Sequence, residues 1–171
     1  MKRKIGYLLL VGIISILCYG VYGKMTFTPL KEKDFECLFP NYTNADVVFY
    51  KDFIGWSHGD YFEFFVYRIA NVEIDSNYPI IDKNWEHVVL PDTVEIVTWS
   101  NCPLDSTTQL KYGNELIWIM DSKIKEGKML QGELKDKNNY YSCIYVNGLE
   151  KYFLLYNPSK DILYYIRQNG F

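Results

Sequence analysis

The sequence lacks the residue patterns that most metal and catalytic sites require. Its 171 residues include only two histidines and four cysteines, and none of these stand at the C-x-x-C or H-x-x-x-H spacing typical of zinc sites. The alternating acids of an EF-hand are absent, as are G-x-S-x-G, a glycine-rich phosphate loop and S-x-x-K. The common signatures of zinc proteins, calcium loops, serine hydrolases and nucleotide-binding enzymes are therefore excluded, and no cofactor is predicted.

The sequence also lacks an excess of basic over acidic residues. Lys2, Arg3 and Lys4 are the only charged residues among the first 23. Subtracting them from the 18 basic residues of the chain leaves 15 against 21 acidic residues, a net charge of −6 for residues 24–171. Binding to nucleic-acid phosphates requires a basic face, and recruitment to anionic lipid requires a polybasic patch. The composition argues against both kinds of partner.

The one long uncharged stretch, residues 5–22, follows the three basic residues at the N-terminus. A signal peptide has this order, with an apolar region of about 7–15 residues and a small residue before the cut. Val21-Tyr22-Gly23 offers such a cut, although it is not of the preferred A-x-A type. An uncleaved anchor needs about 20 residues, with a range of ~17–25, and is slightly favoured by the length of the stretch.

Both interpretations of residues 1–23 give the same topology. The basic residues remain in the cytoplasm, and residues 24–171 form one exported domain. We therefore expect a domain tethered to the cytoplasmic membrane, or a periplasmic or secreted domain if the segment is cleaved. Acylation of Cys18, as in a lipoprotein, is disfavoured because Leu17 stands where a small residue is needed.

Aromatic residues are abundant, with 16 Tyr and 10 Phe in an 18% aromatic share, and they favour strands. The patterns predict an α+β fold: a mainly antiparallel sheet with a C-terminal β-meander and one or two helices packed on one face, preceded by an N-terminal hydrophobic helix. The predicted helices begin at Thr28-Pro29 (ending at Pro40) and at Asn114 (ending at Gly127). The predicted strands cover residues 47–53, 61–72, 94–99, 129–135, 140–146, 151–156 and 162–167, with a loop over 100–109.

The stretch GWSHGDYFEFFVYRI, residues 55–69, holds the best catalytic candidates, His58 and Asp60, with Glu63 nearby. Histidine is the usual general base near neutral pH, and a carboxylate can orient it. However, Ser-His-Gly-Asp is also a turn sequence, and no nucleophile stands at a suitable spacing. We favour a hairpin turn that leads into a buried strand. A metal site using His58 and His87 is disfavoured for lack of paired ligands.

Three cysteines lie in the exported part: Cys37, Cys102 and Cys143. An odd number permits at most one internal disulfide, which an exported location allows. Buried free thiols that act as small apolar residues are an equally good interpretation. A nucleophilic Cys102 is disfavoured, because its neighbours supply no cation or histidine to stabilise a thiolate.

The C-terminal meander is crowded with tyrosines. Adjacent tyrosines on one strand point to opposite faces, so one face is expected to expose Tyr141, Tyr145, Tyr152 and Tyr164. Exposed aromatic sets can mark binding surfaces, while cross-strand pairs that only stabilise the sheet are the favoured alternative.

The sequence matches no family motif, so its function is inferred from these features alone. The leading hypothesis is a non-enzymatic module that binds an envelope protein or a glycan. The alternatives are an exported hydrolase built on His58 with nearby carboxylates, and an anchored structural protein with no specific ligand.

Overall fold

The computed structural model describes residues 7, 10–18, 20–21, 27–55, 60–81, 85, 94–146 and 150–170. Residues 10–18 are helical, and their side chains are exposed. The elements that follow are α2 (Glu32–Leu38), β1 (Asn44–Asp52), β2 (Tyr61–Ala70), β3 (Val94–Asn101), α3 (Ser106–Asp121), α4 (Lys125–Glu133), β4 (Tyr140–Val146), β5 (Glu150–Asn157) and β6 (Ile162–Asn169).

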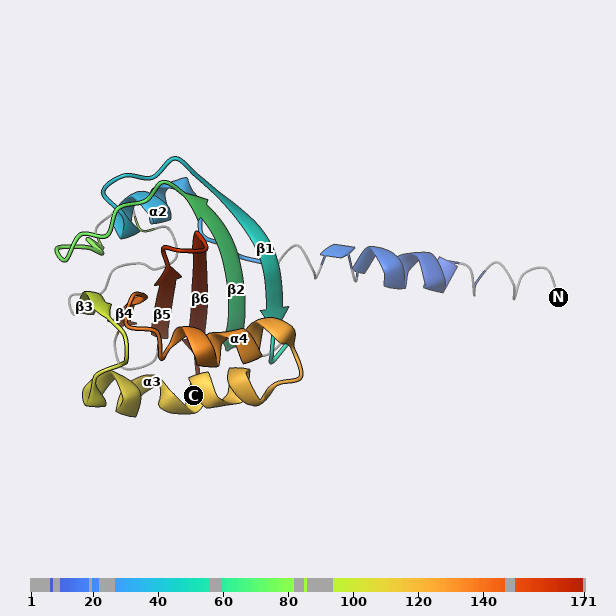
Figure 1. Ribbon diagram of the computed structural model, residues 1–171. Helices are drawn as coiled ribbons and strands as arrows, with labels where there is room; N and C mark the ends of the chain where they lie inside the picture. The colour runs from blue at the N-terminus through green and yellow to red at the C-terminus, as the bar shows by residue number, and fades with distance from the viewer. Residues whose placement is uncertain are drawn as a thin grey trace.

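The six strands form one antiparallel sheet in the order β1-β2-β6-β5-β4-β3 (Figure 1). β4, β5 and β6 pair consecutively as a meander, and β2 pairs with β6 across a long separation in sequence. The predicted α+β fold with an antiparallel sheet and a C-terminal meander is confirmed. β1 and β3 are the two edge strands of the sheet.

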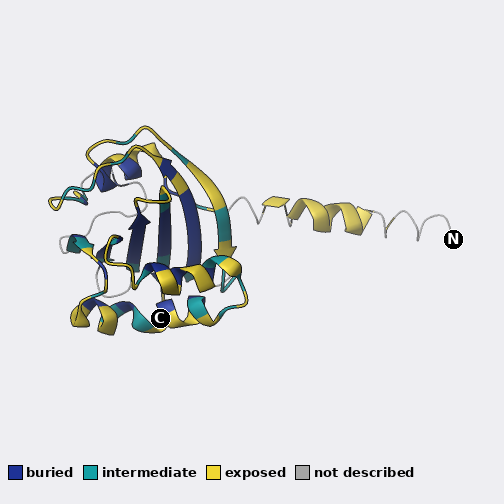
Figure 2. Ribbon diagram, in the orientation of Figure 1, coloured by how far each residue is buried: buried dark blue, intermediate teal, exposed yellow. Residues whose placement is uncertain are grey.

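Helices cover both faces of the sheet, whereas the sequence predicted helices on one face only. α2 lies on one side, and α3 and α4 lie side by side on the other (Figure 1). The central strands between them are buried, as Figure 2 shows. On β2, Phe65 and Tyr67 belong to the core under α2, while Phe62 and Phe64 belong to the core under α3 and α4. This alternation explains why β2 is apolar at nearly every position.

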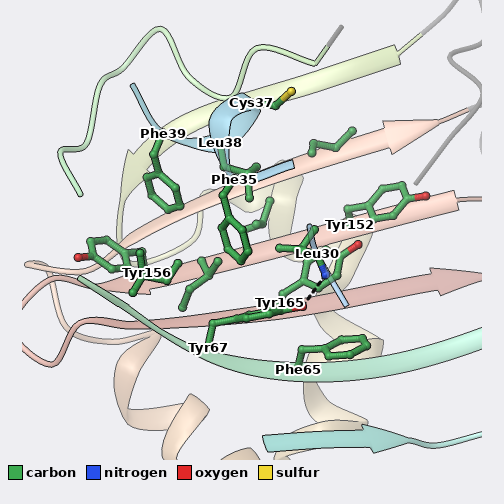
Figure 3. Packing of buried hydrophobic residues seen from close by; sticks show 14 of the residues in the cluster. Leu30, Phe35, Cys37, Leu38, Phe39, Phe65, Tyr67, Tyr152, Tyr156 and Tyr165 are labelled. Carbon is green, nitrogen blue, oxygen red and sulfur yellow. Dashed lines mark hydrogen bonds between the residues drawn. The ribbon is translucent and has the colours of Figure 1, made fainter. Parts of the chain in front are cut away.

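The core under α2 is built largely from rings (Figure 3). Phe35 of α2 meets Tyr67 of β2 edge to face, with ring centroids 5.2 Å apart. The hydroxyl of Tyr67 accepts a hydrogen bond from the backbone N–H of Leu30 at 2.7 Å. The segment before α2 is therefore fixed to the sheet through a buried tyrosine whose polar end is satisfied.

α2 begins later than predicted. The helix starts at Glu32, and the carboxylate of Asp34 accepts a hydrogen bond from the Lys31 backbone N–H at 2.8 Å. Thr28 does not cap the helix; its hydroxyl instead donates to the carboxylate of Glu63 at 3.3 Å. Tertiary contact with β2 has taken the place of the local capping interaction.

The region of α3 and α4 differs most from the predictions. α3 starts at Ser106, inside the predicted loop, because the Asp105 side chain accepts hydrogen bonds from the backbone N–H groups of Thr107 and Thr108. Residues 129–135 were predicted as a strand, but residues up to 133 belong to α4. Gly127 was predicted to end the helix that begins at Asn114, but α3 already ends at Asp121. Gly127 lies within α4, where a Cβ atom would collide with the backbone carbonyl oxygen of Ile119 on α3.

Candidate functional site

Of the two predicted catalytic residues, the structure describes Asp60 but not His58. His58 and His87 lie outside the described residues, so their roles stay predictions. Asp60 directly precedes β2 and lies against Gly170, at the end of β6; a Cβ atom on Gly170 would collide with the Asp60 carboxylate. Gly170 has a φ of 95°, a conformation that glycine adopts without strain. Asp60 therefore stands where β2 and the C-terminal end of β6 meet.

The prediction of an exposed tyrosine face is wrong. Tyr141, Tyr152 and Tyr164 are buried, with exposed fractions of 3%, 0% and 1%. Because helices cover both faces of the sheet, either orientation of a tyrosine leads into a core. Tyr145 is half-buried, and the ammonium of Lys111 lies 5.2 Å from its ring centroid. These four residues offer a partner no common aromatic surface.

A group of polar side chains lies in the interior on the α2 side of β2 and β6. The Glu63 carboxylate accepts a hydrogen bond from the Tyr50 hydroxyl at 2.8 Å and forms an ion pair with Arg167 Nε at 2.7 Å. The Arg167 guanidinium lies 3.9 Å from the Tyr61 ring centroid. The hydroxyls of Tyr61 and Tyr152 are 3.4 Å apart. β1, β2, β5 and β6 are thus joined by one polar network.

Burial governs the electrostatics of this network. Desolvation raises the pKa of the Glu63 carboxyl, and Arg167 and the Tyr50 hydrogen bond oppose that change. Desolvation also raises the pKa of Tyr61 to about 12. The carboxylate is already engaged by Tyr50, Thr28 and Arg167, so the network binds strands to one another, and we assign it a structural role.

A second buried carboxylate, Glu133, fixes the end of α4. It accepts a hydrogen bond from the Asn139 amide at 2.9 Å and pairs with the Lys160 ammonium at 2.6 Å. The Asn157 amide also donates to it. These contacts join α4 to the start of β4 and to the turn between β5 and β6, and they account for a buried charge without a catalytic role.

The cysteines are free thiols, and no disulfide forms. Cys37 lies in the core under α2, whereas Cys102 and Cys143 lie in the core under α3. Burial raises the pKa of the Cys102 thiol to about 12, and it also raises the pKa of the Cys143 thiol. The interpretation as small buried apolar residues is therefore supported over a disulfide or a reactive thiolate.

The outer side and one flank of α3 carry a group of exposed apolar side chains, which the sequence did not single out. Leu110, Ile117 and Trp118 are 86%, 52% and 51% exposed. Leu110 and Ile117 are seven residues apart and share one side of the helix. The Trp118 ring is held in place by Phe62, with ring centroids 5.2 Å apart. We call these three residues the α3 surface.

A hollow of about 180 Å³ adjoins the α3 surface. It is smaller than ligand pockets, which span roughly 300–1,000 Å³, and it has room for an apolar side chain. Gly113 contributes to the hollow because it has no side chain to fill the space. The lining residues are Pro103, Leu104, Gln109, Gly113, Leu116, Ile117, Met120 and Leu134.

Among the described residues there is neither a metal-binding cluster nor a membrane-spanning helix. Within those residues, no group of three or more His, Cys, Asp or Glu side chains is placed to hold a metal ion. No helix among them combines the length and the apolar character that a membrane crossing requires. Comparison of the chain with protein-family models, curated proteins and solved structures found no match.

Proposed function

We propose that residues 24–171 are a non-enzymatic binding domain for another protein, presented on the outer side of the cytoplasmic membrane. The observation that supports this most directly is the α3 surface, where Leu110, Ile117 and Trp118 are exposed and Ile117 borders an apolar hollow. Exposed apolar groups that cluster on one element mark interaction sites more reliably than scattered ones do.

A protein partner fits this surface better than a glycan. Sugar rings stack on aromatic faces and need polar groups nearby, whereas two of the three exposed residues, Leu110 and Ile117, are aliphatic. The hollow is lined mostly by apolar side chains. We infer a partner that inserts one apolar side chain into the hollow and covers Ile117 and Leu110 with others, as in a hot spot surrounded by weaker contacts.

Residues 1–23 supply the tether in this proposal. The basic start and the uncharged stretch 5–22 favour export, whether the segment remains as an anchor or is cleaved as a signal peptide. An exported hydrolase centred on His58 remains a prediction, and no observation on the described residues favours it over a binding domain.

The test is capture of the partner from the native cell envelope by the full chain, tagged at its C-terminus, with mass spectrometry as the readout. Leu110→Glu and Ile117→Glu place charges on the α3 surface. We expect each to lower the yield of a stoichiometric partner about tenfold or more, because a central hot-spot change costs about 2 kcal/mol.

Met129→Glu is the matched control, because Met129 is an exposed apolar residue on α4, 40% accessible and outside the α3 surface. It should capture the partner as well as the unmodified chain does. Equal yields from all four chains would contradict the assignment of the α3 surface, and the absence of any stoichiometric protein would contradict the binding function itself.

A further inference from the structure

No described strand pairs with the outer edge of β1. β1 stands at the end of the sheet and pairs with β2 alone among the described strands. Val47 and Val48 on this strand are 38% and 47% exposed. A long edge strand presents backbone N–H and C=O groups to any chain that can align with it, so the charges along β1 decide which chain fits.

A β-bulge places two charged residues of β1, Asp46 and Lys51, symmetrically about Phe49. Val47 stands opposite Tyr67 and Phe49 opposite Val66 on β2, so Val48 is an extra residue without a partner. The register places Asp46, before the bulge, opposite Arg68, and Lys51, after the bulge, opposite Phe64.

Arg68 and Phe64 are four residues apart on β2 and therefore lie on one face of the sheet. Asp46 and Lys51 consequently share that face too, although they are five residues apart in sequence. Phe49, opposite Val66, is midway between them in the register. Without the bulge, the acidic and the basic side chain would point to opposite faces.

Both charged residues are exposed, and neither has an ion-pair partner in the described part of the chain. Their opposite charges lie at equal register distances from Phe49. A strand with the same sequence, running antiparallel about Phe49, would thus bring an opposite charge to each of them.

We propose that β1 pairs with β1 of a second copy of the chain, across a two-fold axis normal to the sheet at Phe49. This pairing sets Asp46 opposite Lys51 of the second copy, twice, and sets Val47 opposite Tyr50 of the second copy. The two sheets become one continuous antiparallel sheet. The bulge divides the new ladder into a segment before Val48 and a segment after it, and this fixes the register.

The same symmetry suits a tethered domain. Phe27, the first described residue after the N-terminal segment, packs on Tyr50 and Phe65, with ring centroids 5.0 and 5.9 Å away. It therefore lies on the α2 side of the sheet. A two-fold axis normal to the sheet keeps this side in common, so both chains approach from the same side, as one membrane would require. This agreement rests on the proposed tether, whereas the pairing itself rests on the register and the charges.

The test is the dimer dissociation constant of the full chain in detergent micelles, measured by sedimentation equilibrium. Asp46→Lys and Lys51→Asp each set like charges opposite one another twice. Because a cross-strand charge pair contributes roughly 0.2–1 kcal/mol, we expect each single variant to dimerise about tenfold more weakly. The double variant restores both pairs and should dimerise like the unmodified chain.

A mixture of the two single variants provides the decisive measurement. Each variant repels itself, but one presents two cations and the other two anions, so together they should form a mixed dimer of normal strength. A monomeric unmodified chain, single variants that dimerise normally, or a failure of the mixture and the double variant to recover would each overturn the proposal. Because both positions lie on β1, partner capture through the α3 surface should not change, which keeps the two proposals separable.

Discussion

At the scale of single residues, the interior tolerates charge only where partners surround it. Glu63 and Arg167 are nearly inaccessible, with side chains 3% and 12% exposed, and each compensates the other. Removing one partner of a buried pair leaves an uncompensated charge, which typically costs about 3–5 kcal/mol. We therefore expect the fold to be sensitive to the loss of either residue of this pair.

We predict that Arg167→Met lowers the free energy of unfolding by about 3–5 kcal/mol at pH 7, measured by urea denaturation. The matched control is Arg68→Met, because Arg68 is an exposed arginine on β2. It should change the free energy of unfolding by less than about 1 kcal/mol, because Asp46, which lies opposite it on β1, is also exposed. Similar losses for the two variants would show that the buried ion pair has no special weight.

The loss in Arg167→Met should depend on pH. Burial raises the pKa of Glu63, and removing Arg167 raises it further. The folded variant then holds its proton more tightly than the unfolded chain, whose glutamate titrates near pH ~4.3. The contribution of Glu63 to stability is therefore highest at or below that pH and falls as pH rises through the folded pKa. A deficit relative to the unmodified chain that stays constant from pH 4 to pH 7 would contradict this.

At the scale of elements, one residue decides where α3 starts. The Asp105 carboxylate accepts hydrogen bonds from the Thr107 and Thr108 backbone N–H groups at 2.8 and 3.0 Å. It also accepts one from the Tyr141 hydroxyl at 2.8 Å. The hydrogen bonds from Thr108, with that from Tyr141, lower the pKa of Asp105 to about 2. The helix start is thereby joined to β4.

We predict that Asp105→Ala lowers the free energy of unfolding by about 1–2 kcal/mol, as for other N-cap losses. Asp105→Asn keeps a capping oxygen without a charge. A lowered pKa means that the carboxylate adds stability above the unfolded value of ~3.9, and that this stability is lost as pH falls through about 2. The unmodified chain should therefore lose more stability between pH 4 and pH 2 than Asp105→Asn does; parallel profiles would contradict the cap.

The elements also differ in how well local patterns predict them. β2, β4, β5 and β6 follow the predicted strands closely, because their apolar runs and intervening turns leave no helical alternative. Residues 129–135 were wrongly predicted as a strand, because a stretch of seven residues with three apolar ones is too short to reveal its period. Gly127 and Asn114 suggested helix ends, yet both lie inside helices where packing outweighs their preferences.

At the scale of the whole molecule, two cores on opposite faces of one sheet protect the thiols. Cys37, Cys102 and Cys143 are buried, while Cys18 is exposed in the N-terminal helix. A buried thiol with a raised pKa reacts slowly with alkylating reagents, because little thiolate forms.

We predict that the native full chain takes up at most one alkyl group at pH 8, at Cys18, and takes up four after unfolding in urea without reductant. Intact mass spectrometry gives both numbers. A chain that has lost residues 1–23 should take up none when native and three when unfolded, so the same spectrum reports whether the segment is cleaved. Rapid alkylation of Cys102 or Cys143 in the native chain would contradict the closed cores.

The sequence by itself determined the α+β class, the meander of β4, β5 and β6, and an acidic domain behind a basic and apolar N-terminus, because composition and short-range periodicity encode these properties. Only the tertiary structure decided which side chains reach the surface. Tyr141, Tyr152 and Tyr164 became buried because helices cover both faces of the sheet, and Leu110 became exposed because the buried side of α3 faces the sheet. The bulge at Val48 is likewise invisible in the sequence, since it exists only in the register between β1 and β2.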